Sequence, residues 1–209
     1  MEKNESNNVV SITQAKKLNP VNTRERIIDA YIELITKQGF AATTHKQLAE
    51  KAKVSSSTIY YHFAKKTDLY ETLFHHIDEK YLALFDNEDL FTGKLEARVT
   101  LFISLVWQYT QSPLYWIMME IRLVIRNDQM MARTLNHPES FLKKRNQRFT
   151  LILAGSKVSD RKVREAVTYA NISLIGLSYE TVRNPKLANI GGYLRRISRN
   201  MVKMLKSPD

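Results

Sequence analysis

The stretch "TRERIIDAYIELITKQGFAATTHKQLAEKAKVSSSTIYYHFAKKTDLYETLF", residues 23–74, contains two short amphipathic segments separated by a turn. Thr44 and Gln47 have the spacing of a reciprocal N-terminal capping box, so the first short helix is expected to start there. After the turn "KVS", Ser55 or Ser56 is expected to start the second short helix. The inward-facing side chains of these helices are Leu48, Ala49, Ala52, Ile59 and Phe63. Together the two helices predict a helix-turn-helix motif over residues 44–63.

Two longer helices flank this motif. The first is expected to start near Asn22, with Glu25 as its reciprocal cap, and to end at Gly39. The second is expected to run from about Lys66 to Phe85. We therefore assign residues 21–81 to a helix-turn-helix domain, and residues 1–20, rich in Asn, Ser and Lys, to a flexible arm.

The second short helix has the residue types that a DNA-reading helix requires. Ile59 and Phe63 lie one helical turn apart and would fix the helix to its neighbours, while the opposite face would fit the major groove of B-DNA. Lys66 and Thr44 each stand at a helix start, where a side chain and free amides together bind a phosphate. The outward hydroxyls would be those of Ser56, Ser57, Thr58 and Tyr61.

Residues 37–66 also hold six lysines and only one acid, Glu50, within a chain of net charge +11. A basic surface of this kind favours a polyanionic partner. Because the positive charge is spread over the whole chain, net charge alone is weak support for nucleic acid, and the local bias is the better indication.

An ordered set of short motifs runs through this region and is more restrictive than helical spacing. Its members are Arg26-Ile27, Gly39-Phe40, Thr43-Thr44, Leu48-Ala49, Ala52, Val54-Ser55, Tyr60, His62-Phe63, Lys66 and Leu69. With these motifs, residues 23–74 resemble the DNA-binding domain of the TetR family of transcriptional regulators. The resemblance implies DNA contacts at Thr44, Lys46, Ser56, Ser57, Thr58, Tyr60, Tyr61, His62 and Lys66.

Three positions qualify the resemblance. Lys53 stands in the turn where the family usually has Gly, and a left-handed backbone there would cost about 1–2 kcal/mol. His45 replaces a small or branched apolar residue, and we expect it to be partly buried against the domain. Tyr60 either packs wholly in the core or packs its ring while its hydroxyl reaches a phosphate; both interpretations stay open at this point.

The remainder of the chain is also predicted to be helical, because apolar residues recur at three- and four-residue spacing. The expected helices span about 93–109, 112–126, 137–154, 159–182 and 184–205, with starts at Ser112–Pro113, His137–Pro138, Ser159 and Asn184–Pro185. Gly191–Gly192 would then weaken the last helix internally. The periodicity makes the fold class all-α. The resemblance implies a TetR-like arrangement of about nine helices, with residues 82–209 forming the larger domain.

The resemblance implies that this larger domain binds a small-molecule effector and forms a homodimer through the last two long helices. Ala170, Ser173, Gly176 and Ser178 are small residues that would allow the close helix approach of a subunit interface. An apolar effector pocket is expected among adaptable and flat side chains, although such residues are more often plain core. The candidates are Trp107, Tyr109, Trp116, Met118 and Met119.

Composition limits the other classes of function. The chain of 209 residues has no cysteine, which excludes disulfides, thiolate metal sites and a cysteine nucleophile. It lacks the long apolar run of a signal peptide or membrane span, so we expect a cytoplasmic protein. No cofactor is expected, since glycine-rich phosphate loops are missing.

The expected function is therefore a homodimeric repressor that leaves a near-palindromic operator when an effector binds. The alternatives are an activating regulator and an architectural DNA-binding protein without an effector. An enzyme is the remaining class: His75 and Glu79 are one turn apart, but no third metal ligand can be placed beside them, so no metal site and no catalysis are expected.

Overall fold

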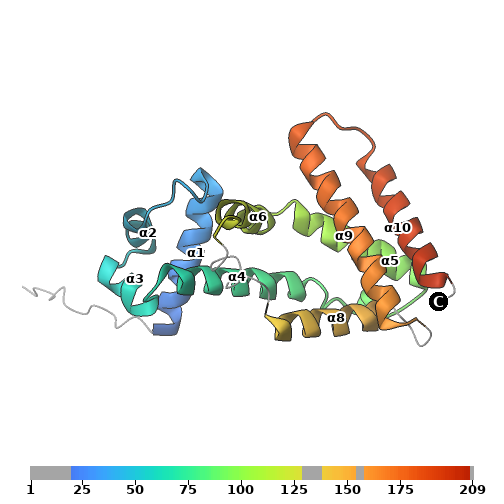
Figure 1. The fold of residues 1–209 in the computed structure, drawn as a ribbon, viewed down its shortest axis with the longest axis horizontal. Helices are drawn as coiled ribbons and strands as arrows, with labels where there is room; N and C mark the ends of the chain where they lie inside the picture. Colours follow the sequence, from blue (N-terminus) through green and yellow to red (C-terminus); the bar gives the residue numbers. More distant parts are fainter. Residues whose placement is uncertain (1–19, 129–137, 154–157, 208–209) are drawn as a thin grey trace, which may run out of the picture.

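The computed structural model describes residues 20–128, 138–153 and 158–207, and these residues form helices without any strand (Figure 1). The all-α prediction is confirmed. The helices are α1 (Pro20–Gln38), α2 (His45–Ala52), α3 (Ser56–His62), α4 (Lys66–Ala83), the 3-10 helix η1 (Glu88–Leu90), α5 (Leu95–Thr110), α6 (Pro113–Ile125), α8 (Glu139–Leu153), α9 (Asp160–Arg183) and α10 (Ile190–Lys206).

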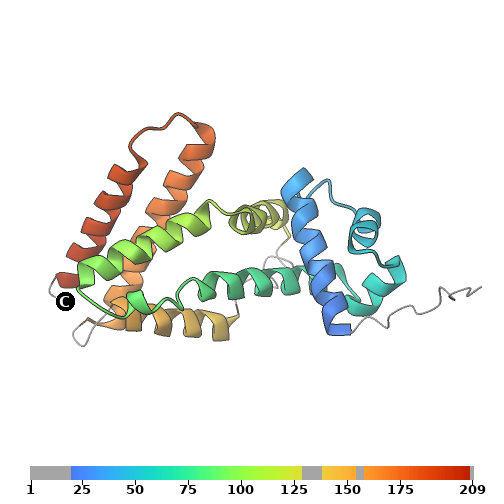
Figure 2. The same ribbon diagram turned by 180° about the vertical axis from the view of Figure 1, so that it is seen from behind.

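The molecule is elongated, with α1–α3 at one end and the long helices α9 and α10 at the other (Figures 1 and 2). We call residues 20–77, which comprise α1–α3 and most of α4, the head. Helix α4 leaves the head and runs toward α8 and α5, and α6 lies beside α1 (Figure 2). Two helices, α4 and α6, thus connect the head with the rest of the chain.

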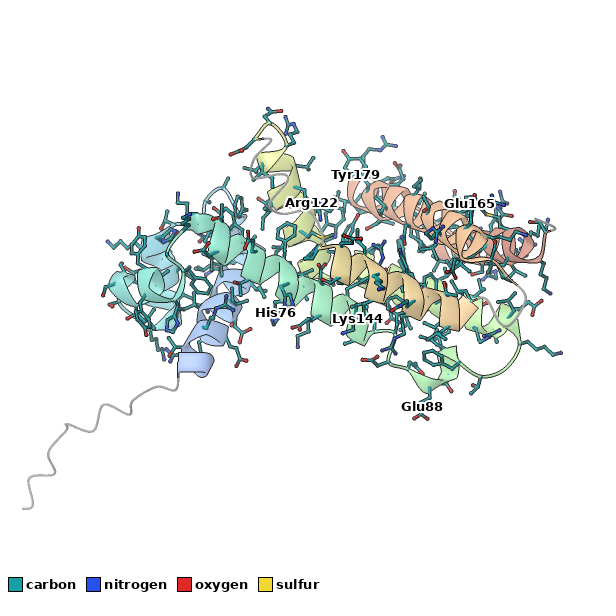
Figure 3. The ribbon with its side chains drawn as sticks, turned by 60° about the horizontal axis from the view of Figure 1, so that its bottom comes forward. His76, Glu88, Arg122, Lys144, Glu165 and Tyr179 are labelled. Atoms are coloured by element: carbon teal, nitrogen blue, oxygen red, sulfur yellow. The ribbon has the colours of Figure 1, made fainter. Side chains whose placement is uncertain are left out.

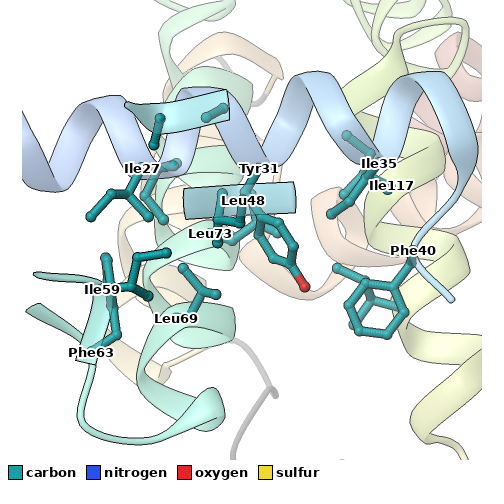
Figure 4. Close-up of a cluster of buried hydrophobic side chains, with 14 of the residues drawn as sticks. Ile27, Tyr31, Ile35, Phe40, Leu48, Ile59, Phe63, Leu69, Leu73 and Ile117 are labelled. Atoms are coloured by element: carbon teal, nitrogen blue, oxygen red, sulfur yellow. The ribbon is translucent and has the colours of Figure 1, made fainter. Parts of the chain in front are cut away.

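The buried side chains form two clusters. The first belongs to the head and includes Ile27, Tyr31, Leu48 and Leu73 (Figure 4). It also includes Ile117 and two further isoleucines of α6, although α6 follows the head by more than thirty residues in the sequence. The second cluster joins the end of α4 and η1 to α5, α8, α9 and α10. The division of the chain at residue 81 stays a prediction, and α6, which follows it in the sequence, packs into the first cluster.

The predicted helix starts rest on side-chain capping, and most of them are confirmed. Thr44, Ser55, Ser112 and Ser159 each cap the helix that follows with a side-chain oxygen. Helix α1 begins two residues earlier than expected, at Pro20, and Gly39 follows its end with φ 85°. The predicted arm up to residue 19, and the predicted helix boundaries His137 and Ala154, lie outside the described residues.

The predicted start of the last helix is wrong. Asn184 instead follows the end of α9, and α10 begins at Ile190 after the N-cap Asn189, which has φ 62°. The Oδ1 atom of Asn189 accepts a hydrogen bond of 3.1 Å from the backbone N–H of Gly192. A Cβ atom on Gly192 would lie 2.4 Å from that oxygen. The two glycines are therefore in the first turn, where the cap requires the open space at Gly192, and the expected internal weakness does not exist.

Candidate nucleic-acid interface

The turn between α2 and α3 has the left-handed residue that the sequence analysis anticipated. Lys53 has φ 53° and ψ 48°. The N–H of Val54 donates to the carbonyl of Ala49 at 3.0 Å, and the N–H of Lys53 donates to that of Glu50 at 3.2 Å. This pair of bonds is the Schellman motif, in which glycine usually takes the position of Lys53. The turn therefore sets the angle between the two short helices at a conformational cost.

Buried side chains on one side of α3 hold it in the head. Ile59 and Phe63 are 0% and 2% exposed, and each contributes about 1.5–3 kcal/mol by its burial. The guanidinium of Arg24 in α1 lies 5.1 Å from the centre of the Phe63 ring. Arg26, also in α1, donates a 2.6 Å hydrogen bond to the carbonyl of Ala52 at the end of α2. Helix α1 thus fixes both members of the motif.

The opposite side of α3 is open to solvent. Tyr61 is 82% exposed, and Ser56 and Ser57 are exposed as well, while Thr58 is half-buried. The hydroxyls of Ser57 and Thr58 lie 2.7 Å and 2.8 Å from the Oγ atom of Ser55, which also caps the helix. The helix therefore presents a row of hydroxyl groups at its start and an aromatic hydroxyl in its middle.

Tyr60 is not a core residue, because it is 57% exposed. Its ring stacks on that of His45, with the ring centres 5.6 Å apart and the planes 14° apart. His45 is half-buried, as expected, and its Nδ1 atom is buried without a hydrogen-bond partner. Burial, and to a lesser degree the charge of Lys66, lower the pKa of His45. The imidazole of His45, whose lowered pKa favours the neutral form, therefore packs against the ring of Tyr60.

Two helix starts meet at one hollow beside α3. Thr44, His45 and Lys66 line this hollow of about 260 Å³ together with side chains of α1 and α4. The hydroxyl of Thr44 lies 2.9 Å from Oε1 of Gln47, to which it donates, so a phosphate contact from this hydroxyl would have to replace that bond. Thr44 and Lys66 were both predicted to contact phosphates, and the fold brings the two side chains to the same hollow.

The remaining candidates for DNA contacts are Lys46 in α2 and His62 at the end of α3. Lys46 is exposed in the first turn of α2. His62 is half-buried, and its ring packs edge-on against Tyr61 with the centres 5.2 Å apart. Each of the nine candidates is thus exposed or half-buried, and none is in the core. Their contacts with DNA stay predictions.

A cavity of about 170 Å³ lies where α4, α5, α6, α8 and α9 meet. Of the five predicted pocket residues, Tyr109 and Met118 line it, whereas Trp107, Trp116 and Met119 are not among its lining residues. Trp107 packs against the second cluster, and the ring of Trp116 packs edge-on against Tyr115. The cavity's polar lining was not predicted from the sequence; it includes Asp78 of α4, Arg145 of α8 and Asn171 of α9.

Helix α9 carries a stripe of exposed apolar side chains, Ile172, Ile175, Tyr179 and Val182. Tyr179 projects from the outer side of the helix (Figure 3). Of the four small residues named for a subunit interface, Ala170 and Ser178 are fully buried in the protomer, and Ser178 donates a 2.9 Å hydrogen bond to the carbonyl of Thr110. The expectation was wrong for these two, because the solvent-facing stripe is a different face of the helix.

Residues 20–128, 138–153 and 158–207 contain no group of three or more His, Cys, Asp or Glu side chains that could hold a metal ion. The His75–Glu79 pair is a surface contact of 3.6 Å between side chains that are both 68% exposed. Among these same residues, every helix is too short or too polar to cross a membrane.

Comparison with known proteins agrees with the geometry of the head. The family model described as "Bacterial regulatory proteins, tetR family" matches residues 27–73. Over 51 residues the chain is 49% identical to the uncharacterized HTH-type transcriptional regulator YvkB of Bacillus subtilis (strain 168), a match that covers 24% of this chain and 27% of YvkB. Over 122 residues it is 30% identical to the HTH-type transcriptional regulator TcmR of Streptomyces glaucescens, covering 56% of this chain and 54% of TcmR. The matches thus span about a quarter and about half of these two relatives.

The likeness in fold extends over nearly the whole chain. The crystal structure of the multidrug binding protein EbrR complexed with imidazole aligns with 89% of this chain and 96% of its own, with a TM-score of 0.63 and 15% identity. At that identity the alignment concerns the fold alone. The helix-turn-helix motif with its exposed α3, the family match over the head and the shared all-helical fold lead to one conclusion. Residues 27–73 form a helix-turn-helix domain of the TetR family, and the chain has the fold of solved TetR-family proteins over nearly its whole length.

Proposed function

We propose that the protein is a homodimeric repressor that binds a near-palindromic operator through α3 and leaves it when a small molecule occupies the cavity. The observation that carries the proposal is the division of α3 into a buried side, Ile59 and Phe63, and an open side that carries Ser56, Ser57 and Tyr61. A helix anchored in this way presents hydroxyls to base edges and phosphates in the major groove.

The apolar stripe on α9 supports the dimer. Ile172, Ile175, Tyr179 and Val182 recur at three- and four-residue spacing on one face, and Ile172 and Tyr179 are 67% and 63% exposed in the single chain. Exposed apolar residues that gather on one face mark an interaction surface. A two-fold axis at this face would pair α9 with its copy, and the two α3 helices would then occupy successive major grooves about 34–36 Å apart.

The contacts of α4 and α6 support release by an effector. Helix α4 supplies Asp78 and Tyr81 to the cavity and carries Lys66 at its other end, in the head. Helix α6 supplies Tyr115 and Met118 to the cavity, and two residues further on Glu120 accepts a 2.8 Å hydrogen bond from the backbone N–H of Phe40. Any ligand that displaces these helices acts directly on the position of the head.

The cavity favours this function over an architectural DNA-binding protein without an effector. An effector shifts the equilibrium only by its difference in affinity between the operator-binding shape and the released shape. The hydrogen bond from Phe40 to Glu120 holds α6 to the turn after α1. Through this bond, α6 would contribute to the difference in effector affinity between the two shapes. Repression rather than activation follows from the resemblance of residues 23–74 to the TetR family, in which repression is the usual mode.

The test is a fluorescence-anisotropy titration of the protein with an operator selected from random DNA, repeated with Glu120→Gln. The wild-type protein should bind with nanomolar affinity, and a cavity ligand found by thermal-shift screening should weaken that binding at least tenfold. The Glu120→Gln variant should bind the operator but respond less to the ligand, because the amide holds the Phe40 N–H more weakly than the carboxylate does. A cavity ligand that binds tightly and leaves operator affinity unchanged would contradict release by an effector.

A further inference from the structure

The size and walls of the cavity limit what it holds. Its volume is about 170 Å³. A cavity of about 150 Å³ lined by apolar side chains takes up benzene, so the volume here suits one aromatic ring with a small substituent. The walls include the rings of Tyr81, Tyr109, Tyr115 and Phe141. Burial raises the pKa of each of the three tyrosines, so their hydroxyls stay neutral and act as hydrogen-bonding groups rather than charges.

Two charged side chains line the cavity, and their surroundings differ. Asp78 is 6% exposed, and its negative charge acts on Arg122, where it partly offsets the lowering of the Arg122 pKa by burial. The charge of Asp78 is thus balanced by a cation that does not itself line the cavity.

The positive charge of Arg145, by contrast, is not balanced by a neighbouring carboxylate of the described residues. Its guanidinium makes one long hydrogen bond, 3.4 Å to Oδ1 of Asn146, and lies 6.0 Å from the centre of the Phe141 ring. Its Nε atom is buried and has no hydrogen-bond partner, and no carboxylate of the described residues forms an ion pair with it. A buried donor without a partner costs free energy that an incoming acceptor recovers.

We propose that the cavity binds a monocyclic aromatic carboxylate, with its ring among the tyrosines and its carboxylate on the guanidinium of Arg145. An arginine binds a carboxylate through two parallel N–H···O bonds, which satisfy the buried donor and fix the orientation of the ring. The inference rests on the proposed function in that it names the chemistry of the effector for the same cavity. The competing chemistry, an aromatic amine held by Asp78, is the outcome that would overturn it.

Isothermal titration calorimetry on the full chain without DNA separates the two chemistries. The probes are benzoate, benzamide and benzylammonium, which share a ring and differ in charge. Benzoate should bind most tightly. Arg145→Met should weaken benzoate binding at least tenfold and change benzamide binding by less than about threefold, because only the charged contact is lost. The matched control is Lys144→Met, which removes the same charge from the neighbouring exposed position of α8.

The ranking of the three probes on the wild-type protein decides the matter even if Arg145→Met does not fold. Tighter binding of benzylammonium than of benzoate, or no binding of any probe at millimolar concentration, would overturn the inference. Arg145→Lys, which keeps the charge without the paired donors, should give an intermediate benzoate affinity. If benzoate binds through Arg145 but leaves operator affinity unchanged, the inference holds and release by this effector class is wrong.

Discussion

Replacing Lys53 with glycine tests the account of the turn between α2 and α3. Lys53 has φ 53°, a left-handed conformation that costs a residue with a Cβ atom about 1–2 kcal/mol. Glycine does not bear this cost, but it loses more backbone entropy on folding, which offsets about 0.5–1 kcal/mol of the gain. Lys53→Gly should therefore raise the free energy of unfolding by about 0.5–1 kcal/mol.

The measurement is urea unfolding followed by circular dichroism at one fixed protein concentration, because the proposed dimer would make stability depend on concentration. For a chain of this length, the gain corresponds to a rise in melting temperature of about 1–4 °C. Lys53→Ala is the control: it removes the same charge but keeps the Cβ atom, so its stability should stay within about 0.5 kcal/mol of the wild type. If the glycine variant proves no more stable than the alanine variant, the left-handed strain assigned to Lys53 is wrong.

Three further variants test other parts of the account. Lys66→Ala should weaken operator binding and reduce the slope of log affinity against log salt by about one, and an unchanged slope would remove Lys66 from the phosphate contacts. His45→Gln tests how stability depends on pH. Because the pKa of His45 is lowered in the folded protein, the unfolded chain binds the proton more readily. The wild type should therefore lose stability as pH falls below about 6.5. Urea midpoints at pH values above and below that point should show a smaller loss for the variant, and an equal loss would refute the assignment. Ile172→Glu should convert the proposed dimer to a monomer in analytical ultracentrifugation, whereas Val124→Glu, a similar change at a 54% exposed position of α6, should leave it a dimer. A dimeric Ile172→Glu protein would exclude this face of α9.

The local features were predicted from the sequence because local chemistry determines them. Thr44 and Gln47 specify a helix start from four residues, and the Schellman turn makes Lys53 left-handed whatever the distant contacts are. The start of α10 was missed for the same kind of reason. Asn184–Pro185 and Asn189 both resemble caps, and only the fold shows that the N–H of Asn184 still bonds to Glu180 of α9, at 2.8 Å.

The cavity could be predicted only in part, because its lining comes from five helices. The density of aromatic and methionine residues indicated Tyr109 and Met118, but it could not give the rotation of α5 and α6 about their axes, which turns Trp107 and Trp116 away from the lining. The charged lining residues lie on other helices, so no local pattern connects them to the cavity. The same holds for the hydrogen bond between Glu120 and Phe40, which joins residues 80 positions apart.

The central claim is that the exposed side of α3 recognises DNA. Selection of binding sites from random DNA, followed by footprinting, tests this claim most directly. Selection with the wild-type protein should yield an inverted repeat whose half-site centres lie one helical turn, about 10–10.5 base pairs, or a multiple of it apart. Selection with Tyr61→Ala should lose enrichment at the base pairs nearest the middle of α3, while circular dichroism stays unchanged. Enrichment of no sequence, or of the same sequence equally by both proteins, would contradict recognition through this surface.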